Sequence, residues 1–470
     1  MISRLSAPLL TLLLFGPSAA AQTRAVVDSI DGFIRSELAR QRVPGISVAV
    51  LRADSLLLIR GYGFANVEHH APATDSTLYG VGSVSKQFTA AAIVMLSDQG
   101  RLSLDDPIVR FLPEGSGVWS RVTIRHLLTH TSGIPQDTMP DWRRDYTESE
   151  LVRSAAAQPL DSDPGDRWSY SSTGYALLGI IIHRVTGVFY GDFLRDHIFR
   201  PLGMGTARVN SDSDIVPNRA AGYYLVGDTL KNQEWVSASI GATADLGLSL
   251  SVRDLAQWAV GLNRGKVLSR AGLEASWTPG RLNNGGTYPY GLGWHVTQQR
   301  GYRRIGHGGS FQGFWATIQR YPDFDLTVIV LTNLAQANPE GIAFGIAGLL
   351  EPVLTPPHLL HARLPGPTPP TPIDRLLRDI ASGEDSAEVT PGLTANTSAA
   401  RREQIAGWVK AIQTWTFLGC DGVRDRRISR LGTRIERICY AKGGALGGQF
   451  LFAVLYGLDW RAAGFDVYFP

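Results

Sequence analysis

The predicted fold class is α+β, and the order of the elements is the reason. Strand-like segments stand near both ends of the first 355 residues and helical segments fill the middle, which predicts one sheet shared by N- and C-terminal strands. A proline-rich stretch then precedes a shorter part with its own helices and strands. The 470 residues are enough for two or three domains with large cores.

The N-terminus predicts export from the cell. Arg4 precedes an apolar run at 5–15, and Ala19-Ala20-Ala21 follows it, which is the order of a secretory signal cleaved after Ala21. The apolar run is too short to span a bilayer, so no transmembrane segment is expected in the mature chain. A periplasmic and an extracellular destination both fit such a signal.

The longer part, residues 22–355, is expected to contain strands near both ends and helices between them. An amphipathic helix is expected over 26–38, ending before Pro44, and then an antiparallel hairpin from 46–51 and 55–60. Helices are expected at 83–98, 123–130 and 175–186, and after the capping box of Ser251 and Asp254. Strands return at 291–296, 314–321 and 326–331.

A stiff spacer at 356–372 is expected to lead into a small α+β unit at 373–470. Helices are predicted there at 373–380 and 401–415, and strands at 434–440 and 449–456. Cys420 and Cys439 are the two cysteines of the chain, and in an exported protein they predict a disulfide within this unit.

Three short motifs carry possible chemistry. Ser83-Val84-Ser85-Lys86 places a hydroxyl and an amine one helical turn apart, as a nucleophile and its proton acceptor require. Lys86 is one of only five lysines beside 40 arginines, so it is one of few amines able to lose a proton near neutral pH. Tyr170-Ser171-Ser172 lies in a polar loop that leads into an apolar helix, and His307-Gly308-Gly309-Ser310 lies between two expected strands. Taken singly, the first motif is equally typical of a helix cap, whereas the second is more typical of a packed loop tyrosine and the third of a glycine turn.

In this order and at these separations, the three motifs resemble the β-lactamase and penicillin-recognising superfamily of serine hydrolases. The likeness is greatest to its class C-like branch, which includes esterases, D-aminopeptidases and D-alanyl-D-alanine carboxypeptidases. Leu127-Leu128-Thr129-His130-Thr131-Ser132-Gly133 and Tyr290-Gly291-Leu292-Gly293-Trp294 are similar to stretches common in that branch. The resemblance covers about residues 28–355 and implies the β-lactamase/transpeptidase-like fold.

The resemblance also implies the roles of the residues. Ser83 would be acylated, and Lys86 and Tyr170 would share the proton transfers, with the base left open between them. The backbone N–H groups of Ser83 and Ser310 would form the oxyanion hole. His307, Gly308, Gly309 and Ser172 would line the substrate site, and neither a metal nor another cofactor is implied.

Two departures from the β-lactamase pattern bear on the substrate. Ser172 stands where the family often has Asn, and it lacks an amide's paired donor and acceptor. His307 stands where many β-lactamases have Lys, and a neutral imidazole binds a carboxylate less strongly than a permanent cation. We therefore expect a small ester or amide substrate, including D-amino acid peptides, with a β-lactam or a carboxypeptidase substrate as the alternative.

Other functions have weaker support in the sequence. The formal charge of +3 and the absence of a long basic block argue against a nucleic-acid partner. His126 and His130 have the spacing of a zinc pair, but no Glu follows His126 as a base. A non-catalytic binding or assembly module on the same fold remains an alternative, and cell-wall material is a possible partner of residues 373–470.

Overall fold

The computed structural model describes residues 19–139, 141–356, 367–384, 386–397, 399–428, 434–445 and 448–468. Of the predicted signal segment only Ala19–Ala21 is described, and it opens helix α1 (Ala19–Gln41). The predicted cleavage point therefore falls in the first turn of α1. Of the predicted spacer, Pro356 and residues 367–372 are described, and the rest lies outside the described residues.

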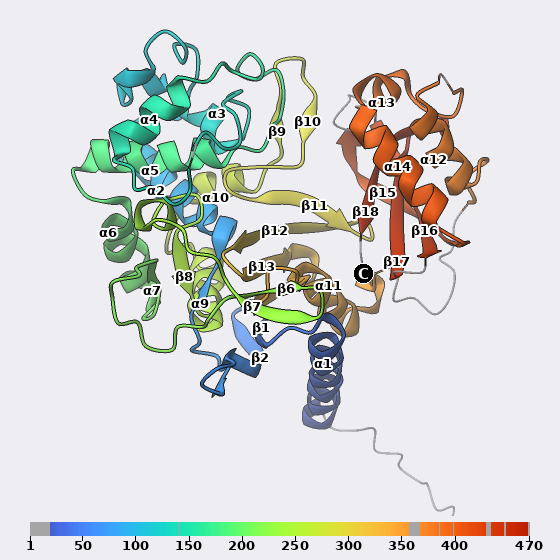
Figure 1. Cartoon of the computed structure of the whole chain (residues 1–470), viewed down its shortest axis with the longest axis horizontal. Helices are drawn as coiled ribbons and strands as arrows, with labels where there is room; N and C mark the ends of the chain where they lie inside the picture. The colour runs from blue at the N-terminus through green and yellow to red at the C-terminus, as the bar shows by residue number, and fades with distance from the viewer. Residues whose placement is uncertain are drawn as a thin grey trace, which may run out of the picture.

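A seven-stranded antiparallel sheet forms the centre of the first part (Figure 1). Its strands, in spatial order, are β11 (His295–Gln299), β12 (Tyr302–Phe311), β13 (Phe314–Tyr321), β14 (Leu326–Thr332), β1 (Gly45–Arg52), β2 (Ser55–Asn66) and β3 (Ala71–Pro72). The N-terminal β1 pairs directly with β14, from Ile46 opposite Thr332 to Arg52 opposite Leu326. The expected sharing of one sheet by strands from both ends of this part is confirmed.

Both faces of the sheet are covered, because β1 is apolar on both sides. Val48 and Val50 pack with α1 and α11 (Pro339–Leu350), whereas Ala49 and Leu51 join the larger helical core on the opposite face. Successive side chains of a strand point to opposite faces, so a strand buried between two layers is a continuous apolar run.

The helical layer on that opposite face lies between β3 and β11 in sequence. Its helices are α2 (Lys86–Asp98), α3 (Ile124–Leu128), α4 (Glu148–Ala156), α5 (Ser172–Thr186), α6 (Tyr190–Leu194), α7 (Arg200–Leu202), α8 (Ala238–Gly241), α9 (Val252–Asn263) and α10 (Arg270–Ser276). The predicted capping box is confirmed at α9, where the Ser251 hydroxyl accepts from the Asp254 N–H. The same stretch of sequence contains the short strands β4 (Tyr79–Gly80), β5 (Arg208–Val209), β6 (Tyr223–Val226), β7 (Thr229–Asn232), β8 (Leu248–Leu250), β9 (Gly280–Arg281) and β10 (Thr287–Tyr288). Of these, β6 and β7 pack with the core on the α1 and α11 face.

Two predicted elements differ from the structure. The helix expected from Ser83 is a 3-10 turn over Gly82–Ser85 followed by α2 from Lys86. The strand expected at 291–296 begins only at His295, because Gly293 has a positive φ of 80° and breaks the extended backbone before it.

The C-terminal part is a four-stranded antiparallel meander with helices packed on it. The strands are β15 (Thr414–Ile428), β16 (Arg434–Ala445), β17 (Gly448–Tyr456) and β18 (Ala462–Tyr468), and the helices are α12 (Ile373–Ser382), α13 (Pro391–Asn396) and α14 (Ala399–Ala411). The helix predicted to run to Trp415 ends earlier, at Ala411, and Trp415 belongs to β15. Cys420 and Cys439 stand opposite each other on β15 and β16 and are joined as a disulfide.

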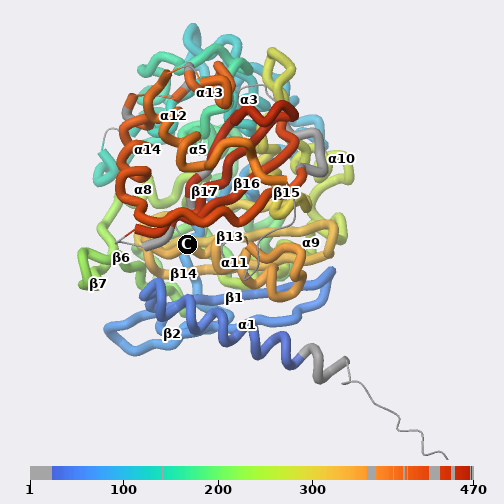
Figure 2. The backbone as a smooth tube through the Cα atoms, turned by 90° about the vertical axis from the view of Figure 1, so that its right-hand side faces the viewer, coloured from blue at the N-terminus to red at the C-terminus, as the bar shows by residue number. Residues whose placement is uncertain are grey.

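The C-terminal part packs beside the β11 edge of the large sheet (Figures 1 and 2). At this contact Arg300, in the β11–β12 hairpin, donates to Asp421 of β15 at 2.8 Å. Both side chains are largely buried, with 13% and 15% of their surface exposed.

No single helix among the described residues is long and apolar enough to cross a bilayer. Only α5 taken together with Tyr190–Leu202, bent by 77°, meets the length and composition requirement.

Candidate active site

Ser83 and Lys86 lie where the chain changes from a 3-10 turn to helix α2. Gly82 opens the turn with a φ of +51°, a conformation that favours glycine, and Lys86 is the first residue of α2. The Lys86 Nζ atom lies 3.0 Å from the Ser83 Oγ atom. The predicted hydroxyl and amine are therefore in hydrogen-bond contact.

Lys86 is fully buried and has two further acceptors. Its Nζ atom lies 3.0 Å from the backbone oxygen of Asp245 and 3.3 Å from the Ser172 Oγ atom. An ammonium group can donate to all three acceptors. A lysine that is to take a proton from Ser83 must first lose one, so its charge state governs the chemistry open to the site.

Tyr170 and Ser172 reach the same point from the loop before α5. The ring of Tyr170 lies 5.0 Å from Lys86 Nζ, measured to the ring centroid. Ser171 caps α5 by accepting from the Gly174 N–H, and this cap directs the chain so that Tyr170 and Ser172 flank Lys86. Tyr170 and Ser172, which the sequence could link to Ser83 and Lys86 only by resemblance, thus share one cluster with them.

His307 lies within strand β12 and not in a turn between two strands. Its Nδ1 atom donates to the Gly308 carbonyl oxygen at 2.5 Å, so its Nε2 atom accepts from the Tyr290 hydroxyl at 3.0 Å. Burial, together with the charges of His295 and Lys86, holds the pKa of His307 well below its usual range. The imidazole is therefore neutral near pH 7 and supplies no permanent positive charge.

Glycines bring β12 against the Ser83 turn. A Cβ atom on Gly309 would lie 2.5 Å from the Ser83 nitrogen and 2.2 Å from the Val81 oxygen. A Cβ atom on Gly82 would lie 2.7 Å from the Ser310 nitrogen. Only residues without a side chain allow this approach, which places the backbone N–H groups of Ser83 and Ser310 in the same small region.

The sequence reading missed a group of buried aromatic side chains behind Tyr170. The ring of His130 is within 5.1 Å of the rings of Tyr170, Tyr175 and Tyr290, measured between centroids. These rings come from segments far apart in the chain, so no local pattern could have joined them.

Asp245 was also missed. This fully buried residue lies in the loop between α8 and β8, and one carboxylate oxygen is 3.9 Å from Lys86 Nζ. It stands 159 residues from Lys86 in sequence and belongs to no motif. An acidic residue among apolar neighbours, as in Ala244-Asp245-Leu246, is the only local signal it offers.

The two histidines with the spacing of a zinc pair accept hydrogen bonds from two different backbone N–H groups. His126 Nδ1 accepts from the Thr123 N–H in the cap of α3, and His130 Nδ1 accepts from the Ser171 N–H. Among the described residues no group of three metal-ligating side chains occurs. The zinc interpretation of His126 and His130 has no structural support.

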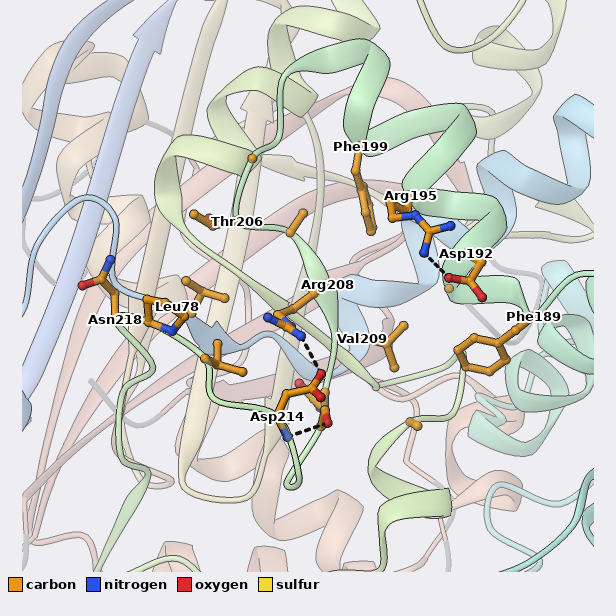
Figure 3. A pocket seen from close by; sticks show the side chains of 18 residues that line it. Leu78, Phe189, Asp192, Arg195, Phe199, Thr206, Arg208, Val209, Asp214 and Asn218 are labelled. Carbon is orange, nitrogen blue, oxygen red and sulfur yellow. Dashed lines mark hydrogen bonds and ion pairs between the residues drawn. The ribbon is translucent and has the colours of Figure 1, made fainter.

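A cavity of about 640 Å³ lies beside α6 and the 205–218 loop, away from Ser83 (Figure 3). Two ion pairs, Arg195 with Asp192 and Arg208 with Asp214, face it. A second cavity, of about 350 Å³, shares Leu78 and Arg208 with the first and reaches Phe311 and Gln312, just beyond Ser310. Cavity size alone therefore does not locate the Ser83 site.

The chain belongs to the beta-lactamase family, whose family model matches residues 30–346. This is a family of serine hydrolases and penicillin-binding proteins, and the match contains all the site residues described above.

Two curated relatives show the range of the family. Penicillin-binding protein 4* of Bacillus subtilis is 32% identical over 308 residues, which cover 61% of this chain and 67% of that protein. Protein flp of Staphylococcus aureus is 28% identical over 319 residues, covering 65% of this chain and 62% of that protein. The chain thus spans about two thirds of the length of these relatives.

Solved structures are similar in fold. The D-amino acid amidase of Ochrobactrum anthropi has a TM-score of 0.60 at 26% identity, covering 70% of this chain and 98% of that one. The octameric penicillin-binding protein homologue of Pyrococcus abyssi has a TM-score of 0.60 at 24% identity and covers 94% of this chain and 96% of that one. The second likeness includes the C-terminal part and concerns the fold alone.

Proposed function

We propose that this protein is an exported serine hydrolase that acts on small amide, peptide or ester substrates through an acyl-enzyme at Ser83. The contact between Ser83 Oγ and the buried Lys86 Nζ at 3.0 Å is the observation that carries the proposal. A hydroxyl becomes a useful nucleophile only beside a group able to take its proton, and Lys86 occupies that place.

The reaction proceeds in two acyl transfers. Ser83 Oγ forms a bond to the carbonyl carbon while its proton passes to the Lys86 and Tyr170 pair. The Ser83 and Ser310 N–H groups stabilise the oxyanion. The bond to the leaving group then breaks, and the amine or alcohol departs with the proton. Water, deprotonated by the same pair, attacks the ester carbonyl. The bond from the acyl carbon to Ser83 Oγ breaks, Oγ takes the proton back from the pair, and the acid leaves.

The substrate class is inferred from the neutral walls of the site. His307 is neutral and Ser172 Oγ is a contact of Lys86, so neither supplies a strong carboxylate or acylamide anchor. The relatives include a D-amino acid amidase and penicillin-binding proteins, which favours amide and peptide substrates built on D-amino acids over a bare ester. Cell-wall peptide is therefore the partner that we propose for this protein.

Intact-mass spectrometry tests the acyl-enzyme. The mature protein is exposed to a fluorophosphonate, a penicillin, a p-nitrophenyl ester and a D-amino acid amide, with Ser83→Ala alongside. We expect a covalent gain on the wild type alone, and peptide fragmentation that assigns it to Ser83 rather than Ser85. The reagent that turns over identifies the substrate class.

The competing function, a binding module on the same fold, predicts the opposite result. The proposal would be overturned in favour of that module by two results together. The folded wild type would gain mass from none of the four reagents, and the Ser83→Ala variant would keep the cellular role of the wild type.

Export is tested separately by N-terminal sequencing of the protein recovered outside the cytoplasm. A mature chain that begins at Gln22 is expected. An uncleaved Met1 in that fraction would contradict the proposed signal.

A further inference from the structure

Asp245 is the charged group nearest to Lys86 in the described structure. Its backbone oxygen accepts from Lys86 Nζ at 3.0 Å, and its carboxylate oxygen Oδ2 lies 3.9 Å from the same atom. Exposed surface is 0% for the Lys86 side chain and 1% for that of Asp245. Neither carboxylate oxygen makes a hydrogen bond of normal geometry.

A buried carboxylate with no hydrogen bond of normal geometry is costly unless an opposite charge is close, and a buried ammonium likewise needs a partner. Burial raises the pKa of Asp245, and the positive charge of Lys86 is the largest opposing cause, followed by polar contacts with Thr243, with its own backbone and with Ser172. Each group is thus placed to stabilise the charged form of the other.

The other groups around this pair are hydroxyls, phenol rings and imidazoles. Ser83 and Ser172 are hydroxyls, and the rings of Tyr170 and Tyr175 lie 5.0 and 5.6 Å from Lys86 Nζ. The remaining neighbours are two histidines whose pKa values burial lowers and a tyrosine near Asp245 whose pKa burial raises: His130, His307 and Tyr190.

We propose that Asp245 is a positioning residue whose carboxylate fixes the charge state of Lys86, and thereby the pH range in which Lys86 can accept the Ser83 proton. The catalytic consequence rests on the proposed function. The electrostatic consequence does not, because it concerns only the titration of Lys86. An anion within 4 Å favours the ammonium form, so removing the Asp245 charge is expected to make Lys86 easier to deprotonate.

The direct test is the titration of Lys86 in the full chain, followed by NMR of lysine labelled at the side-chain carbon and nitrogen. The chain has five lysines, so Lys86→Arg identifies the Lys86 signal. In Asp245→Asn we expect the midpoint of that titration to fall by about 1 to 3 pH units. The acidic limb of the kcat/KM profile should move in the same direction.

Asp254→Asn is the matched control. Asp254 is also a buried carboxylate, but it accepts from Ser251 and Thr206 at the start of α9. The Asp254→Asn substitution should lower the melting temperature of the protein without changing the midpoint of the Lys86 titration. An Asp245→Asn variant that behaves like this control, with the midpoint of the wild type, would overturn the proposal and leave Asp245 a purely structural residue.

A reciprocal measurement covers the case in which Asp245→Asn does not fold. Removing the amine in Lys86→Met should raise the pKa of the Asp245 carboxyl, observed in aspartate-labelled protein, since the coupling acts equally on both groups. No change in that carboxyl would refute the coupling.

The two proposals fail separately. A shifted Lys86 midpoint in a protein that forms no acyl-enzyme would refute the hydrolase and keep the Asp245 pairing. A normal acyl-enzyme, together with a Lys86 midpoint that does not shift in Asp245→Asn, would refute the Asp245 pairing and keep the hydrolase.

Discussion

At the scale of single residues, the geometry of the site depends on two glycines as much as on its polar side chains. Gly82 and Gly309 let β12 approach the turn that carries Ser83. A methyl group at either place would have to push backbone apart, because the nearest atoms are backbone nitrogen and oxygen.

Gly309→Ala should therefore lower the rate of acylation by about 100-fold or more, the effect of losing one oxyanion donor. Stopped-flow acylation by an activated ester measures this loss. Gly32→Ala is the control, because Gly32 lies in α1 with open space around it and should leave acylation unchanged. Equal rates for both variants would show that the Gly309 contact does not shape the reaction.

Burial of two neutral histidines makes stability depend on pH. Burial is the largest cause of the lowered pKa values of His130 and His307. Below about pH 6.5 the unfolded chain binds protons at these positions and the native chain does not, so the free energy of unfolding falls as pH falls.

We expect the wild type to lose stability between pH 7.5 and 5.5, by up to about 1.4 kcal/mol per histidine for each pH unit below 6.5. Urea unfolding at both pH values measures it, and His307→Asn should have a shallower dependence. An equal slope in the variant would mean that His307 is protonated in the native protein.

At the scale of elements, caps decide where helices begin. The Ser251 hydroxyl accepts from the Asp254 N–H at 3.2 Å, and the Ser251 backbone N–H donates to the Asp254 carboxylate at 2.9 Å, which closes the capping box of α9. α9 packs against β1 and β14, so its first turn anchors the helical layer to the sheet.

Ser251→Ala should lower the free energy of unfolding by about 1 to 2 kcal/mol. Acylation per folded molecule should stay as in the wild type, because α9 contributes no group to the site. Chemical denaturation and titration of active sites measure the two quantities. Ser36→Ala, on the exposed side of α1, should change neither, and a similar loss in both variants would refute the role of the cap.

At the scale of the whole molecule, one ion pair links the C-terminal part to the large sheet. Arg300 has a positive φ of 52° in the β11–β12 hairpin and donates both to Asp421 and to the Thr355 carbonyl oxygen at the start of the spacer. β10, which precedes the Tyr290 that holds His307, also contacts β15. The C-terminal part therefore packs next to a wall of the candidate active site.

We expect Arg300→Ala and Asp421→Ala each to loosen this contact and to speed hydrogen exchange of the backbone in β11 and β15. The double variant should cost less stability than the sum of the single ones, with a coupling of about 0.5 to 3 kcal/mol. Hydrogen exchange and a double-mutant cycle measure the two effects. Additive changes, with exchange in β11 and β15 no faster than in the wild type, would show that the pair does not hold the two parts together.

The sequence by itself determined the elements that local chemistry defines. The apolar runs predicted β13 and β14, Ser251 and Asp254 predicted the start of α9, and the strand order predicted a sheet joining both ends of the first part. Periodicity and caps are local properties, so they can be read from neighbouring residues.

The tertiary structure alone decided which distant residues meet. Asp245 contacts Lys86 although 159 positions separate them in sequence. The aromatic rings around His130 come from separate segments, and the close approach of Gly309 to the Ser83 turn depends on the position of β12. The residue pattern suggested Ser83 with Lys86 because they lie one helical turn apart, whereas Tyr170 and His307 entered only by resemblance. Spatial contacts between such distant residues are set by how the layers pack, and no short stretch of sequence encodes that packing.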